Sequence, residues 1–174
     1  MNPYRIAYKG LKSGTHNIDF DIDADFFKTF ETSRINESAI KVDIEIDSRS
    51  TMMVFDFTIS GTFKADCDRC TALIDVSITG EDQMIFKFSE EEVTNTDEVI
   101  FIDPKETHID LTQVLYQLIH AHMPISASRD CDAEDYKYCD HKILDRLEYR
   151  DPEEESNENR ENPLWGALKD LDLK

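Results

Sequence analysis

Alternation of apolar and charged side chains is clearest near the middle of the chain. Over residues 40–46 every second side chain is apolar and those between are charged, which is the period of a half-buried β-strand. A second alternating run, over residues 53–59, follows a short polar stretch, so the two runs predict an antiparallel hairpin. Gly61 is expected to break or bulge the continuation of the second run.

Two further alternating stretches follow the first pair of cysteines. Every second residue is apolar from Ile74 to Ile78 and again from Met84 to Phe88, which predicts another hairpin or one long bent strand. Residues 98–102 predict one more short strand. The middle of the chain is therefore expected to form mostly antiparallel sheet.

The clearest predicted helix begins at Asp110 and ends before Pro124. Asp110 is an acceptable N-cap, and Gln113 follows three residues later, in the manner of a capping box. Shorter helices are expected over residues 23–31 and 140–149. One stripe of side chains at helical spacing gives the main helix its buried face: Leu111, Val114, Leu115, Leu118, Ile119 and His122.

Together these elements predict a single α+β domain over residues 1–150, with an antiparallel and potentially barrel-like sheet packed by one main amphipathic helix. Residues 151–162 carry no sizeable apolar side chain except a proline ring, and they predict a disordered acidic linker. Residues 163–174 are expected either to anchor a partner or to cover the chain's own sheet. The candidate partner-binding residues are Leu164, Trp165, Leu168 and Leu171.

Composition adds a strong negative charge to this picture. The chain has 174 residues, with 19 Lys and Arg against 38 Asp and Glu, and its formal net charge is -19. Such a surface repels phosphate, which excludes nonspecific nucleic-acid binding outside a local basic patch and favours a basic protein as partner. Because the chain lacks both a membrane-length apolar stretch and a signal peptide's apolar region, we expect a cytoplasmic location.

Four cysteines are the strongest candidates for chemistry. Structural disulfides are not expected in a reducing cytoplasm. Cys67 and Cys70 form a C-x-x-C knuckle after a predicted strand, and such a knuckle can present two thiolates to one tetrahedral zinc ion. Cys131 and Cys139 could complete the ligand set across the fold, and His141 could replace one of them, although their spacing exceeds that of a compact zinc module.

Two other interpretations of the cysteines stay open. The thiols could be packed without a metal, or the C-x-x-C pair could serve a zinc- or thiol-dependent redox protein. A redox thiol needs a lowered pKa, whereas Asp66 and Asp68 flank Cys67 and oppose thiolate formation. The chain also contains no phosphate-binding glycine motif, no G-x-S-x-G elbow and no H-E-x-x-H helix. We therefore expect no enzymatic activity.

Several short motifs occur in a distinctive order along the chain. They are Gly61-Thr62-Phe63, Cys67-Asp68-Arg69-Cys70, Ile109-Asp110-Leu111, Met123-Pro124 and Asn162-Pro163-Leu164-Trp165. Their order and spacing resemble the YceD family, also called large ribosomal RNA subunit accumulation proteins. The resemblance implies a noncatalytic cytosolic factor that supports synthesis, processing or stability of the 23S ribosomal RNA.

Two features depart from the family pattern. Many relatives carry a compact group of cysteines after the proline, whereas here residues 132–138 separate Cys131 from Cys139, and relatives often have arginine at the position of Leu164. Together with the net charge, the resemblance predicts a basic large-subunit ribosomal protein or a pre-ribosomal particle as partner. The alternative is direct RNA contact through Arg129, Lys137, Lys142, Arg146 and Arg150.

Overall fold

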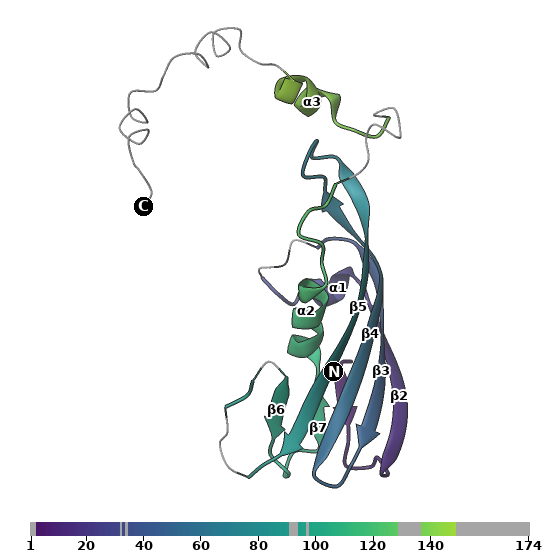
Figure 1. Cartoon of the computed structure of the whole chain (residues 1–174), viewed down its shortest axis with the longest axis vertical. Helices are drawn as coiled ribbons and strands as arrows, with labels where there is room; N and C mark the ends of the chain where they lie inside the picture. Colours follow the sequence, from purple (N-terminus) through teal and green to yellow (C-terminus); the bar gives the residue numbers. More distant parts are fainter. Residues whose placement is uncertain are drawn as a thin grey trace, which may run out of the picture.

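The computed structural model describes residues 3–31, 33, 35–90, 94–96, 98–128 and 137–148. The predicted linker and C-terminal segment, residues 151–174, lie outside this range. Figure 1 shows the elements in chain order: β1 (Arg5–Ala7), β2 (Gly14–Ile22), α1 (Ala24–Phe27), β3 (Ser38–Ser48), β4 (Met52–Asp66), β5 (Leu73–Phe88), β6 (Val99–Ile102), β7 (His108–Asp110), α2 (Thr112–Ala121) and α3 (His141–Glu148).

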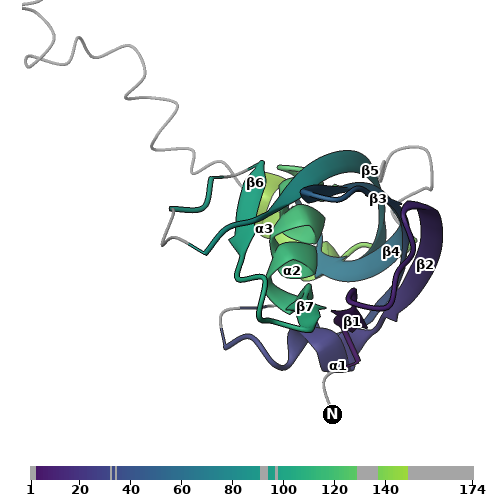
Figure 2. The same cartoon turned by 90° about the horizontal axis from the view of Figure 1, so that it is seen from below.

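The main sheet has the strand order β2-β3-β4-β5-β6. Its pairs from β2 to β5 are antiparallel, as the alternating runs predict, but β6 pairs with β5 in parallel. The sheet curls around α2 without closing (Figure 2), because β2 and β6 remain separate edges among the described strands. The predicted α+β class is confirmed, and the curled sheet of the described strands does not form a closed barrel. The short β1–β7 pair forms a separate two-stranded sheet.

The hydrophobic core lies between the concave face of this sheet and α2. Side chains that alternate along β3 and β4 face inward and are almost fully buried, and α2 adds Val114, Leu115 and Ile119. Each such side chain contributes about 1.5–3 kcal/mol when it leaves water. The inward-facing members from the two central strands are Ile40, Val42, Ile44, Ile46, Met53, Phe55, Phe57 and Ile59.

Gly61 neither breaks nor bulges β4, which corrects the sequence-based expectation. The register between β3 and β4 runs without interruption through the pair Ile40 and Gly61. A Cβ atom on Gly61 would lie 2.3 Å from the carbonyl oxygen of Ala39, and the glycine has a φ of 150°. The glycine therefore permits a close approach of two strands in a conformation that other residues rarely adopt.

The helices match their predictions in place but differ at their ends. Main helix α2 begins after Leu111, because Asp110 belongs to β7, although the Asp110 carboxylate still accepts a 3.0 Å hydrogen bond from the Thr112 N–H. Helix α1 is shorter than predicted, and the Asp23 side chain caps it. Helix α3 lies within the predicted range. None of the described helices combines the length and apolar character needed to cross a bilayer.

Candidate functional site

The C-x-x-C pair lies at the tip of the long hairpin formed by β4 and β5. The Cys67 N–H donates to the carbonyl of Ala72 and the Thr71 N–H donates to the carbonyl of Cys67, each at 2.8 Å, so the knuckle is a tight hydrogen-bonded turn. Thr71 occupies the left-handed region, with a φ of 59°. Both cysteine side chains point into the core, since Cys67 and Cys70 are each 1% exposed.

Asp68 joins this tip to the chain that follows α2. Its N–H donates to the carbonyl of Ala127 at 2.8 Å, and its carboxylate accepts from the Ala127 N–H at 2.7 Å. A hydrogen bond to a carboxylate is stronger than one between neutral groups. Asp68 therefore holds the segment after Pro124 against the hairpin tip, a role that its position beside a cysteine did not predict.

The described cysteines are thiols packed against one hydrophobic core. Cys67 and Cys70 belong to the buried cluster, and the half-buried Cys139 packs against it. Thiol–disulfide exchange requires access of an attacking thiolate to sulfur. Burial of both C-x-x-C sulfurs therefore disfavours the redox interpretation and agrees with a role in packing.

A structural zinc site needs four ligands, typically thiolates and imidazoles. Within the described ranges no three His, Cys, Asp or Glu residues form a group suited to a metal ion. Cys67 and Cys70 supply two thiols from one turn, whereas Cys131 lies outside the described residues. The described residues alone therefore do not complete a tetrahedral zinc set, and zinc binding stays a prediction.

Replacing Cys70 with serine tests how these thiols act. We expect Cys70→Ser to lower the free energy of unfolding by about 1–3 kcal/mol, because it buries a hydroxyl in an apolar site. Urea unfolding with zinc analysis of the purified protein measures both effects, and Cys139→Ser is the half-buried control. An unchanged stability would contradict the packing role. Stoichiometric zinc in the parent, lost together with the fold in Cys70→Ser, would instead establish a structural metal site.

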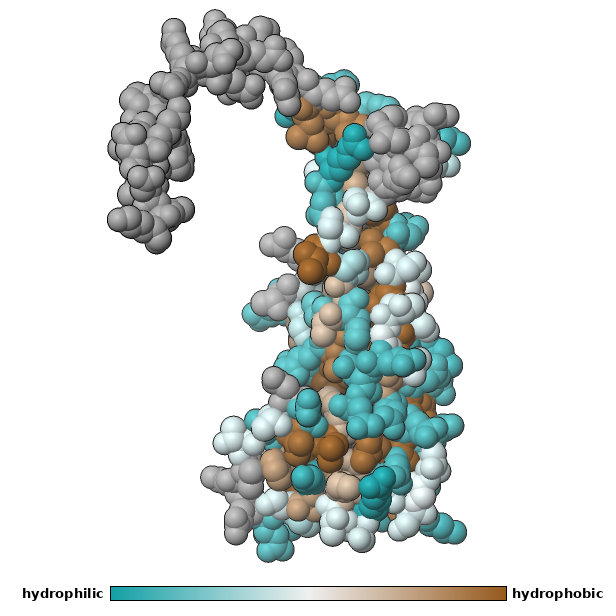
Figure 3. Space-filling model, in the orientation of Figure 1, coloured by the Kyte–Doolittle hydropathy of each residue, from teal (hydrophilic) through white to brown (hydrophobic). Residues whose placement is uncertain are grey.

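Carboxylates gather on the outer face of the main sheet. The strand register places Asp19 directly opposite Asp43, and Glu45 directly opposite Asp56. Like charges in directly opposed positions destabilise a sheet. Figure 3 shows hydrophilic side chains gathered over the middle of the long strands. This register brings like charges close together and makes the outer face acidic.

Lys41 illustrates how negative this outer face is. Its ammonium group lies 2.7 Å from the Asp43 carboxylate. That hydrogen bond and the charge of Asp43 raise the pKa of Lys41, and the nearby carboxylates of Asp19 and Asp21 raise it further. One lysine among three carboxylates leaves a net negative surface.

The basic residues predicted for RNA contact are only partly described. Lys142 and Arg146 lie on α3, and the Lys137 ammonium lies 5.1 Å from the centre of the Tyr138 ring. Arg129 and Arg150 lie outside the described residues. The predicted partner-binding residues lie outside them too: Leu164, Trp165, Leu168 and Leu171.

Comparison with known proteins assigns the chain to a family. A family model described as large ribosomal RNA subunit accumulation protein YceD matches residues 55–172. The chain belongs to the YceD family. The matched region includes the hairpin tip with its C-x-x-C turn and α2, so the resemblance seen in the motifs is confirmed. No curated protein and no solved structure matches the chain significantly.

Proposed function

We propose that this YceD protein is a noncatalytic ribosome-biogenesis factor that supports synthesis, processing or stability of the 23S ribosomal RNA of the large subunit. Membership of the YceD family carries the proposal, because the family description names accumulation of the large ribosomal RNA subunit. The burial of the C-x-x-C thiols supports this proposal over a thiol-dependent redox protein. We also propose that it acts in the cytoplasm, because the family description points to ribosomal RNA.

We further propose that the protein acts through a basic protein partner. Its net charge of -19 makes direct contact with polyanionic RNA unfavourable. The opposed carboxylates on β2, β3 and β4 supply a surface that steers a cationic protein toward the sheet. A basic large-subunit ribosomal protein fits this chemistry. The apolar segment at residues 163–174 is proposed as a second contact.

A binding assay without cells tests the partner class. The immobilised protein is exposed separately to ribonuclease-treated proteins extracted from purified large subunits and to protein-free 23S ribosomal RNA. We expect retention of one or a few basic ribosomal proteins, identified by mass spectrometry, and no retention of the RNA. Retention of the RNA alone would contradict a protein partner and favour the basic residues around α3.

The charge dependence of this binding has a matched control. Neutralising the opposed carboxylates in Asp19→Asn with Glu45→Gln should weaken binding of the retained protein by about tenfold, because it removes two carboxylates from the outer face. Glu31→Gln with Glu106→Gln changes the net charge equally at two exposed positions outside that face. Equal weakening by both double variants would show a general charge effect and would contradict a defined binding face.

A further inference from the structure

A gap in strand pairing lies along one edge of β5. Strand β6 pairs with β5 only from Ile85 to Phe88. Further along the same strand, the His122 side chain lies against Gly80, where a Cβ atom would come within 2.2 Å of the imidazole ring. Between these two points, no strand in the described part of the chain pairs with this edge of β5.

The strand register shows which residues of β5 direct their backbone N–H and C=O groups into this gap. The Ile85 N–H donates to the carbonyl of Glu98 at 2.8 Å, so residue 85 directs its backbone groups toward the β6 side. Backbone groups alternate between the two edges of a strand. Gln83 and Glu81 therefore direct their N–H and C=O groups toward the gap. An edge that no described strand pairs can serve as a template for an added strand.

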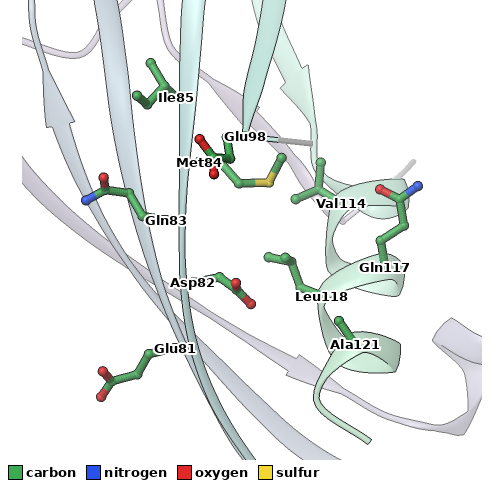
Figure 4. A pocket seen from close by; sticks show the side chains of 10 residues that line it. All are labelled: Glu81, Asp82, Gln83, Met84, Ile85, Glu98, Val114, Gln117, Leu118 and Ala121. Atoms are coloured by element: carbon green, nitrogen blue, oxygen red, sulfur yellow. The ribbon is translucent and has the colours of Figure 1, made fainter. Parts of the chain in front are cut away.

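A groove of about 690 Å³ lies between this edge and α2. Figure 4 shows Met84 and Asp82 on the side of β5 that faces the helix, opposite Val114 and Leu118, whereas Glu81 and Gln83 point away from the helix. Met84 and Val114 are buried and Leu118 is half-buried. The groove thus has an apolar floor beside an open strand edge.

Acidic side chains dominate the charge at the groove. Glu81, Asp82 and Glu98 line it, and no lysine or arginine is among its described lining residues. Asp82 is joined to His122 by a 2.5 Å contact between the carboxylate and the imidazole nitrogen. Gln83 donates to Asp56 on the neighbouring strand at 2.7 Å, which extends the acidic surface onto β4.

We propose that this groove binds an extended basic segment of the partner protein, which adds as a strand to the edge of β5. In an added strand alternate side chains would face α2 and the outer surface in turn. Apolar side chains fit against Met84, Val114 and Leu118, and lysine or arginine side chains fit beside Glu81. Charge complementarity excludes the chain's own acidic segment at residues 151–162 as occupant. The proposal rests on the proposed function, from which it takes the basic partner.

The test uses the full chain and a labelled peptide of about six alternating lysine and valine residues, a usual strand length. Fluorescence anisotropy measures its binding against a peptide of the same composition with all lysines before all valines. We expect the alternating peptide to bind at least about tenfold more tightly, because only its pattern matches the two faces of the groove. Equal binding of the two peptides would overturn the proposal.

Two blocking experiments separate strand addition from charge attraction. Ala121→Trp fills the groove without changing charge and should weaken binding by about tenfold, whereas Gln113→Trp, at an exposed position of α2 outside the groove, should change it by less than about twofold. N-methylation of every second peptide amide can block either the amides that face β5 or the amides that face away from it. Only the first pattern should abolish binding, because only those amides donate hydrogen bonds to β5. Equal weakening of peptide binding by Ala121→Trp and Gln113→Trp would overturn the proposal, and so would equal weakening by the two N-methylation patterns.

Cell experiments keep this proposal separate from the proposed function. Failure of the peptide to bind, with large-subunit RNA still dependent on the protein, would remove the groove assignment and leave the biogenesis role intact. Self-association of the parent that Ala121→Trp abolishes would assign the groove to a second copy of the chain and would likewise overturn the basic segment.

Discussion

Replacing Gly61 with alanine should lower the free energy of unfolding by about 2–5 kcal/mol, the combined range for backbone strain and overpacking. A Cβ atom at this position would lie 2.3 Å from the Ala39 carbonyl oxygen and 2.6 Å from the Cα of Ile40. Both are backbone atoms of the paired strand, so relief requires β3 and β4 to separate. Urea unfolding followed by circular dichroism measures the change.

Gly10 provides the matched control for this substitution. A Cβ atom on Gly10 would meet no atom within 4 Å, so Gly10→Ala should change stability by less than about 0.5 kcal/mol. Similar small effects of both substitutions would contradict the close approach of β3 and β4 at Gly61.

The second large effect is expected from removing a ring in the core. Phe86 is 1% exposed on β5, and its ring centre lies 4.5 Å from that of Phe55. We expect Phe86→Ala to cost about 3–5 kcal/mol, since it removes a buried aromatic side chain and leaves a cavity that the sheet fills only partly.

Leu73→Ala tests whether this cost comes from burial. Leu73 lies on the same strand but is 59% exposed, so its truncation should cost less than about 1 kcal/mol. The two variants are compared by their urea unfolding midpoints, which report stability when the slope of the unfolding free energy against urea concentration is unchanged. Equal destabilisation by the two truncations would contradict the inward direction of Phe86.

Strong alternation of apolar and polar residues made the central strands predictable. Pairing between strands far apart in the sequence was less visible. The runs over residues 40–46 and 53–59 appear as the paired strands β3 and β4. Strand β2 was missed although Ile18 and Phe20 alternate with carboxylates, a signal of the same period. The three-residue strands β1 and β7 are too short for a periodic pattern, and their pairing joins residues about a hundred positions apart.

The C-x-x-C motif was visible in the sequence, whereas its contacts in the fold were not. The C-x-x-C spacing identified Cys67 and Cys70, but their burial depends on how the hairpin tip meets the core. The hydrogen bonds between Asp68 and Ala127 join residues separated by 59 positions, which no local pattern reveals. The β5–α2 groove depends on where β6 stops pairing and where His122 packs, both set by tertiary structure.

The acidic outer face was within reach of sequence reasoning. Charged residues occupy the polar positions of the alternating runs, so carboxylates such as Asp43 and Glu45 were expected on one side of a strand. What the sequence could not supply was the register that places Asp19 opposite Asp43. Register is set by the whole buried face and by the connections between strands.

The most direct test of the biogenesis role is the ratio of 23S to 16S ribosomal RNA in the protein's native cells after its depletion. A selective fall in the 23S RNA, restored by an intact copy of the gene, is the result that the proposed function predicts. An unchanged ratio after complete depletion would contradict it.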